Sequence, residues 1–156
     1  MNDMLFIEKV DFTSDEYLES LKLREEILRK PIGLKISKEQ LDNEKNNNHY
    51  HFIAKQSKKV ISALTMKINP NSIQTCQIAT DENYRGNGIG EKLLYFGEEY
   101  ILSFIKKKEF VVFSRLTSLS FYKNCSYEFK NDRIYIINGI EHRLLKKTCG
   151  NNVYSS

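Results

Sequence analysis

The stretch Tyr84-Arg85-Gly86-Asn87-Gly88-Ile89-Gly90 decides how this sequence is interpreted. It lies between a predicted strand and a predicted long helix, and its three glycines alternate with other residues. Glycines allow the backbone to turn so that successive N–H groups point towards one place. The first turn of the following helix adds unpaired N–H groups and the positive end of the helix dipole. The stretch therefore predicts an anion-binding site, for which a diphosphate is the natural ligand.

Two familiar phosphate-binding motifs do not account for this stretch. A P-loop ends in Gly-Lys followed by Ser or Thr, whereas Gly90 is followed by Glu91. The dinucleotide-binding fingerprint has the spacing GxGxxG within a βαβ unit, whereas Gly86-x-Gly88-x-Gly90 follows a predicted antiparallel meander. Taken alone, the glycines also leave open a plain, flexible connection between a strand and a helix.

The pattern outward from this stretch predicts an α+β domain, that is, a mixed α/β sheet with flanking helices. Predicted strands occupy residues 4–10, 51–56, 60–68, 72–80, 110–114, 127–130, 134–137 and 141–146, and predicted helices occupy residues 14–30, 37–44, 88–106 and 117–124. The first helix is expected to stop before Pro31. The inner face of the long helix is expected to include Phe104 and Gly97, where a missing side chain would let the helix approach the sheet closely.

The 156 residues predict a single domain, residues 1–147, followed by a polar tail, residues 148–156. With 40% hydrophobic and 28% charged residues, the composition is that of a globular protein and excludes a disordered or collagen-like chain. The net charge of +4 favours a polyanionic ligand but is too small to indicate a nucleic-acid partner. No apolar run is long enough to predict a membrane span. Three cysteines without metal-ligand spacing, and no signal peptide, predict a cytoplasmic protein without a metal.

Two signatures in this sequence resemble those of the GNAT superfamily of N-acyltransferases. Arg85-x-x-Gly88-x-Gly90 matches the Q/R-x-x-G-x-G/A signature, and Ser114-Arg115-x-x-Ser118-x-x-Phe121-Tyr122-Lys123 resembles a second signature near the end of the domain. Gly139-Ile140-Glu141-His142 and Leu23-Arg24-x-x-Ile27-Leu28-Arg29 resemble weaker patterns of a bacterial subset. The resemblance spans residues 5–147, and its order of elements agrees with the one predicted above.

The resemblance implies a GNAT-like fold, with a central, mostly antiparallel sheet in which two strands splay apart around acetyl-CoA as co-substrate. Its pantetheine would pair like an added strand with residues on the strand before the glycines. Arg115 replaces an Asn that is common in the second signature, and we expect it to contact the cofactor phosphates. The resemblance thus implies cofactor contacts at Ile78, Ala79, Thr80, Arg85, Gly86, Asn87, Gly88, Ile89, Gly90 and Arg115. Dimers are frequent among the proteins resembled, so a homodimer is possible.

The implied reaction is the direct transfer of an acetyl group to a primary amine of a small molecule or protein. The family's usual general acid is a tyrosine that matches Tyr122, and a phenol of pKa about 10 can return a proton to a thiolate of similar basicity. The alternative for Tyr122 is a core aromatic packed under the cofactor. His142 is expected either as the base or in substrate contact, or in a structural hydrogen bond. His51 and Glu82 are further candidate bases, and an amine already deprotonated before binding needs none.

Arg24 falls inside the apolar stripe of the first predicted helix, where a charge must be paired or must face a cavity. It is expected either to line a ligand cleft and bind the acceptor, or to form a structural ion pair. Cys76 is disfavoured as a nucleophile because direct transfer requires none. The alternative function is a non-catalytic acyl-CoA-binding or interaction module that keeps the glycine stretch and lacks a base.

Overall fold

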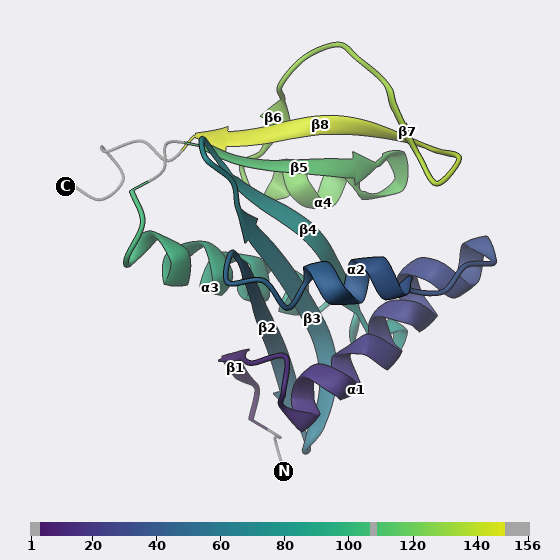
Figure 1. Cartoon of the computed structure of the whole chain (residues 1–156), viewed down its shortest axis with the longest axis vertical. Helices are drawn as coiled ribbons and strands as arrows, with labels where there is room; N and C mark the ends of the chain where they lie inside the picture. The colour runs from purple at the N-terminus through teal and green to yellow at the C-terminus, as the bar shows by residue number, and fades with distance from the viewer. Residues whose placement is uncertain (1–3, 107–108, 149–156) are drawn as a thin grey trace.

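The computed structural model describes residues 4–106 and 109–148, which form one eight-stranded sheet with helices on both faces (Figure 1). The strand order is β1-β2-β3-β4-β5-β8-β6, and β7 also pairs with β8. The strands are β1 (Phe6–Val10), β2 (His49–Gln56), β3 (Lys59–Ile68), β4 (Ile73–Thr80), β5 (Glu109–Arg115), β6 (Glu128–Phe129), β7 (Tyr135–Ile137) and β8 (Ile140–Thr148). The helices are α1 (Asp15–Arg24), α2 (Lys38–Asn43), α3 (Ile89–Leu102) and α4 (Leu119–Asn124), with shorter helical segments η1 (Glu25–Arg29), η2 (Lys30–Ile32), η3 (Glu82–Tyr84) and η4 (Leu116–Ser118).

The strands β4 and β5 separate soon after they begin. They pair in parallel only between Ile73–Thr75 and Phe110–Val112, whereas the other strand pairs of the described chain are antiparallel. In Figure 1 the strands β2, β3 and β4 run steeply, and β5 and β8 cross the top of the molecule at a wide angle to them. The predicted mixed sheet, mostly antiparallel with one splayed pair, is therefore confirmed.

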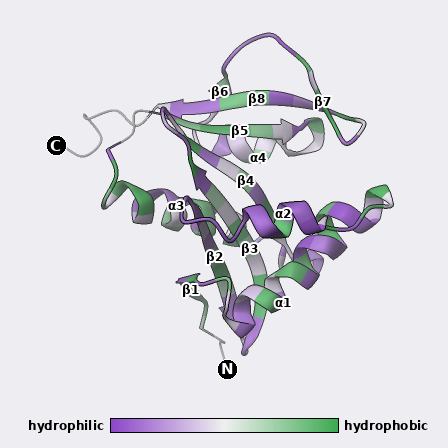
Figure 2. Ribbon diagram, in the orientation of Figure 1, coloured by the Kyte–Doolittle hydropathy of each residue, from purple (hydrophilic) through white to green (hydrophobic). Residues whose placement is uncertain are grey.

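Both faces of the central sheet are buried, because its strands alternate between two apolar clusters. Ile53 of β2 and Ala63 of β3 pack with Tyr17 of α1 on one face. Their sequence neighbours Phe52 and Leu64 belong to the larger cluster around α3 on the other face. The short α2 is mostly hydrophilic in Figure 2, in keeping with its sequence KEQLDN, and none of its residues is fully buried.

Gly97 lies where α3 approaches the sheet closely, as the sequence predicts. A Cβ atom added at this position would lie 2.7 Å from Leu64 Cδ2 and 2.9 Å from Met66 Sδ, both closer than a real Cβ contact allows. The missing side chain therefore lets α3 pack closely against β3.

The structure differs from three of the expectations. The first helix does not end before Pro31: it continues from α1 into the π-helix η1 and the 3-10 helix η2, whose first turn accepts a proline because no backbone donor is needed there. Phe104 is half exposed, because α3 ends at Leu102. Strand β8 extends to Thr148, so only residues 149–156 of the predicted tail remain, and these lie outside the described residues.

Candidate active site

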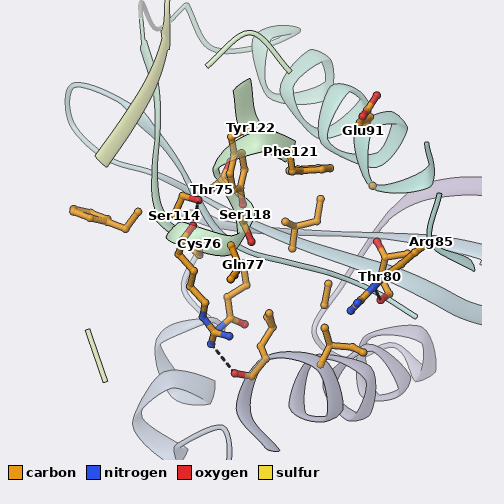
Figure 3. Close-up of a pocket in the computed structure, with 18 of the residues that line it drawn as sticks. Thr75, Cys76, Gln77, Thr80, Arg85, Glu91, Ser114, Ser118, Phe121 and Tyr122 are labelled. Atoms are coloured by element: carbon orange, nitrogen blue, oxygen red, sulfur yellow. Dashed lines mark hydrogen bonds between the residues drawn. The ribbon is translucent and has the colours of Figure 1, made fainter. Parts of the chain in front are cut away.

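A cavity of about 820 Å³ opens where β4 and β5 separate (Figure 3). Its walls come from β4, the glycine stretch and start of α3, the end of β5, α4, the segment η1 and the β7–β8 hairpin. Figure 3 places Arg85 and Thr80 together at one side, and Ser114, Ser118 and Tyr122 around Cys76 at the other. A volume of this size is typical of sites for small molecules and cofactors.

The glycine stretch has the backbone geometry that an anion site requires. Gly86 and Gly88 have φ angles of +85° and +72°, a left-handed conformation that residues with a side chain rarely adopt. A Cβ added at either glycine would meet no atom within 4 Å, so both face open space in the cavity. The first amides of α3 follow directly, since the first bond of the helix runs from Lys92 N to Gly88 O. The main chain of this stretch therefore presents donors to the cavity.

Strand β4 presents a free edge to the same cavity. Its pairing with β3 passes from Thr65↔Gln77 to Met66↔Thr75, so Cys76 is an extra residue that forms a β-bulge. Beyond Thr75, β4 pairs with no strand of residues 4–106 and 109–148 on the side of β5. Ile78, Ala79 and Thr80, for which a cofactor contact is predicted, all line the cavity along this edge.

The two arginines for which cofactor contact is predicted lie in different surroundings. Arg85 belongs to the glycine stretch, and its Nε donates to Thr80 O at 3.3 Å. Asn87 closes the same turn through a hydrogen bond from Nδ2 to Tyr84 O at 3.4 Å. Arg115 instead donates from Nη2 to Leu28 O at 2.7 Å, so its guanidinium lies against η1.

Tyr122 lies on α4 and lines the cavity, although only 5% of its surface is exposed. Its ring packs edge-on against Phe121 and Tyr127. Burial raises the pKa of Tyr122 above its ordinary value, so the phenol carries its proton throughout the neutral range. The position is compatible with both predicted roles of Tyr122, the core aromatic and the general acid, because the ring is part of the core and the residue lines the cavity.

His142 lies on β8 opposite Arg115 of β5 and also lines the cavity. Its Nδ1 is 2.8 Å from Ile140 O, and since a carbonyl can only accept, Nδ1 carries the proton of this hydrogen bond. In the neutral ring, Nε2 then has a free lone pair. The structural hydrogen bond that the sequence left as an alternative therefore also prepares Nε2 to accept a proton.

The other candidate bases, and the cysteine, do not fit a catalytic role. His51 is buried away from the cavity, with Nε2 3.0 Å from Glu44 O and Nδ1 3.0 Å from Thr65 Oγ1, and burial lowers its pKa. Glu82 lies in η3 and does not line the cavity. Cys76 does line it, but burial raises the pKa of its thiol to about 12, so the reactive thiolate is scarce.

Arg24 forms the structural pair that was one of its two expected roles. Its guanidinium is only 1% exposed and donates to both carboxylate oxygens of Glu44, to Oε1 at 2.8 Å and to Oε2 at 2.5 Å. It also donates to Gln77 Oε1 of β4 at 2.8 Å. Arg24 is not among the described residues that line the main cavity, so we do not assign it to substrate binding.

Arg29 lines the cavity, although the sequence analysis gave it no role. It is five residues beyond Arg24, a spacing that an α-helix would turn onto another face. The π-helix η1 widens the turn there, and such irregular turns are frequent at functional sites. Helical periodicity could not have found this residue.

No group of three metal-binding side chains, and no helix able to span a membrane, occurs in residues 4–106 and 109–148.

Comparisons with known proteins agree with this geometry. Residues 14–127 match the acetyltransferase (GNAT) family model, whereas no curated protein matches the chain. Similar solved structures include the ribosomal-protein-S18-alanine N-acetyltransferase from Escherichia coli, with a TM-score of 0.76, 15% identity and coverage of 96% of this chain and 98% of that one. The PaiA N-acetyltransferase from Thermoplasma acidophilum, solved with coenzyme A, has a TM-score of 0.71, 15% identity and coverage of 93% and 99%. The IAA acetyltransferase from Bacillus cereus has a TM-score of 0.70, 19% identity and coverage of 93% and 99%.

Proposed function

Because the chain belongs to the GNAT family of acetyltransferases, we propose that it transfers an acetyl group from acetyl-CoA directly to a primary amine. The family match and the fold support acetyl transfer in general, and the CoA-bound relative supports acetyl-CoA as the donor. The choice of Tyr122 and His142 as the groups that move protons rests on the cavity of this chain.

The residues that line the cavity suit coenzyme A at one end. Gly86 and Gly88 adopt left-handed turns beside open space in the cavity, and the first amides of α3, which follow directly, can donate to a diphosphate there. Arg85 adds a positive charge beside these amides. Residues Ile78 to Thr80 offer the unpaired edge of β4 to the amide groups of pantetheine. When bound, acetyl-CoA supplies the activated acetyl group.

Two residues of the cavity can carry out the proton transfers that this reaction requires. A bond forms between the amine nitrogen and the acetyl carbon, and the bond from that carbon to the CoA sulfur breaks. The proton that the amine loses passes to His142 Nε2, and the departing sulfur takes a proton from the Tyr122 hydroxyl. Amides on the unpaired edge of β4 can stabilise the negative charge that develops on the carbonyl oxygen.

One observation carries this proposal: a single cavity joins the glycine stretch and the free edge of β4 to Tyr122 and His142. The test is an assay that detects free CoA from acetyl-CoA across a broad panel of amines, with N-acetylated product identified by mass spectrometry. Release of CoA that depends on an amine is expected. If acetyl-CoA binds and stabilises the protein yet no amine is acetylated, the non-catalytic acyl-CoA-binding module is the better description.

A further inference from the structure

Charge is unevenly distributed around the cavity. Three arginines line it, one beside the glycine stretch (Arg85) and two near η1 and β8 (Arg29 and Arg115). Among the described residues that line it, Glu91 alone carries a carboxylate, and this residue lies in the first turn of α3. The end of the cavity that holds Arg29, Arg115 and His142 therefore has positive charge and no acid.

The guanidinium of Arg29 is half-buried without an ion-pair partner in the described chain. Its Nη2 donates to Gln40 Oε1 at 3.2 Å, a neutral oxygen. The other end of the same amide donates to Glu44 Oε2 at 3.0 Å, so Gln40 stands between Arg29 and that carboxylate. Burial lowers the pKa of Arg29, and the charges of Arg115 and Arg24 lower it further.

Glu44 attracts Arg29 only from behind Gln40 and forms no ion pair with it, because its carboxylate oxygens bind other groups. Arg24 contacts both of them, and Tyr17 Oη donates to Oε1 at 2.9 Å. Arg115 likewise has only a neutral partner, the carbonyl of Leu28. A guanidinium carries five N–H donors, and each of these two arginines uses one of them in a hydrogen bond within the described chain.

Two guanidiniums that repel each other, half-buried at one end of a cavity with free donors, are arranged as they would be for an anionic ligand. We propose that the amine acceptor carries a carboxylate, as a free amino acid does, and that Arg29 and Arg115 bind this carboxylate. The proposal rests on the proposed function and deepens it. It reassigns Arg115 from the cofactor phosphates to the acceptor, because its guanidinium contacts η1.

The same charges disfavour other acceptors. A polyamine or an aminoglycoside remains positively charged beside its reacting amine, and such a group needs a carboxylate partner when it is buried. At this end of the cavity it would instead meet two arginines at close range. An amino acid presents its amine and its carboxylate one carbon apart, so the arginines could hold the carboxylate while His142 Nε2 faces the amine.

The test uses matched acceptors that differ only in the carboxylate. Each of the twenty amino acids is compared with its amide and with the amine that remains after decarboxylation, in the assay for free CoA. At least one amino acid is expected to have a kcat/KM about 100-fold above that of its amide and its decarboxylated amine, because a charged hydrogen-bonded pair is lost. If amides, decarboxylated amines or polyamines are acetylated as well as or better than every amino acid, the proposal is overturned and the proposed function stands.

Variants separate the two ends of the cavity. Arg29→Gln and Arg115→Gln are expected to raise the acceptor KM at least tenfold and to leave the KM for acetyl-CoA within threefold. Arg85→Gln, at the glycine stretch, is expected to raise the KM for acetyl-CoA at least tenfold and to leave the acceptor KM within threefold. Arg133→Gln, at an exposed arginine outside the cavity, is the control for loss of charge and changes neither value. If Arg115→Gln raises the KM for acetyl-CoA instead, Arg115 belongs to the cofactor and the proposal is overturned.

A binding measurement keeps this inference distinct from catalysis. Calorimetry with the same amino acids and their N-acetyl derivatives, on protein saturated with CoA, is expected to detect binding that Arg29→Gln weakens at least tenfold. If such binding is seen without acetyl transfer to any amine, the carboxylate site stands and the proposed function fails. If no amino acid or N-acetyl derivative binds or reacts, the carboxylate site fails, and the proposed function fails with it only when no other amine of the panel is acetylated.

Discussion

The two ends of the cavity are built from different parts of the chain. At the glycine stretch, one continuous segment lines the cavity, and under the proposed function its main chain would supply most of the donors to the cofactor. At the other end, the side chains come from three separate elements, η1, β5 and β8, which carry Arg29, Arg115 and His142. The first end depends on backbone conformation, and the second depends on packing between distant elements.

The difference has a consequence for specificity. Main-chain amides at a helix start bind the same diphosphate whatever the surrounding side chains are. Side chains at the far end can change without disturbing that site, and under the proposed function they would decide which amine is bound. A variant that disrupts one end should therefore leave binding at the other end unchanged.

Gly88→Glu is expected to have the largest effect. It places a carboxylate and a strained backbone where the proposed function puts the diphosphate, so acetyl-CoA affinity should fall at least about 1000-fold, since like charges in contact cost several kcal/mol. Calorimetry measures the loss. The matched control is Gly33→Glu, because Gly33 has nearly the same φ, +74° against +72°, and equally open surroundings, but lies outside the cavity. Comparable loss in both variants would mean that strain, and not the site, is responsible.

Tyr122→Phe tests the point where the two ends meet. Removal of the proton donor should lower kcat about 100-fold and leave the acetyl-CoA affinity within about threefold, because the ring still packs against Phe121. The control is Tyr127→Phe, a buried neighbour whose hydroxyl donates to Glu98 Oε2 at 2.6 Å. That variant should lose about 2 kcal/mol of stability and keep its kcat. Unchanged turnover in Tyr122→Phe would exclude Tyr122 as the acid.

Titration of Glu44 tests whether its ion pair with Arg24, which lies behind Gln40 and Arg29, stabilises the fold. Burial favours its neutral form, but the hydrogen bonds and charge of Arg24 lower its pKa to about 2. Because the folded pKa lies below the unfolded one, the stabilisation is complete above about pH 5 and is lost as the pH falls towards 2. The free energy of unfolding should thus fall by about 2 kcal/mol more in wild type than in Glu44→Gln between about pH 6 and pH 3. Urea unfolding at each pH measures this difference.

Glu98 is the control for this pH effect because its pKa is shifted the other way. It is 3% exposed, and burial raises its pKa despite the bonds from Lys147 and Tyr127. Its stabilisation is present at low pH and is lost as the pH rises through the folded pKa. Glu98→Gln should therefore lose at least as much stability in acid as the wild type does, because it removes a group whose protonation partly offsets the loss at Glu44. Equal slopes for wild type and Glu44→Gln would mean that the Arg24–Glu44 pair does not stabilise the fold.

The sequence predicts the features that depend on local residue type better than those that depend on packing between distant elements. The glycine stretch could be identified because the conformation of Gly86 and Gly88 depends on local residue type. Gly97 could be placed against the sheet from helical periodicity alone. The partner of Arg24 could not be predicted, because Glu44 lies twenty residues away on a separate element. The position of Arg29 at the cavity could not be predicted, because the π-helix η1 interrupts the α-helical periodicity from which buried faces are inferred.

Gly90→Ala is the smallest change and the finest test of the glycine stretch. Gly90 has no left-handed conformation to lose, so alanine suits the helix. Its Cβ, however, would lie 3.1 Å from Phe121 Cε1 and 3.4 Å from Thr80 Oγ1, so the Phe121 ring must shift by a few tenths of an ångström. Phe121 lines the cavity beside Tyr122, and such a displacement should raise the Kd of acetyl-CoA about fivefold.

The acceptor KM should remain unchanged in Gly90→Ala, because no hydrogen bond or ring contact of the described chain joins Arg29, Arg115 or His142 to Gly90 or Phe121. The control is Gly97→Ala on the same helix, where the new Cβ meets Leu64 Cδ2 at 2.7 Å in the core. That variant should lose about 1–3 kcal/mol of stability while its folded fraction keeps the wild-type Kd. A change in acceptor KM for Gly90→Ala as large as that in Kd would mean that the two ends are coupled through α4, since Phe121 and Tyr122 are neighbours on that helix.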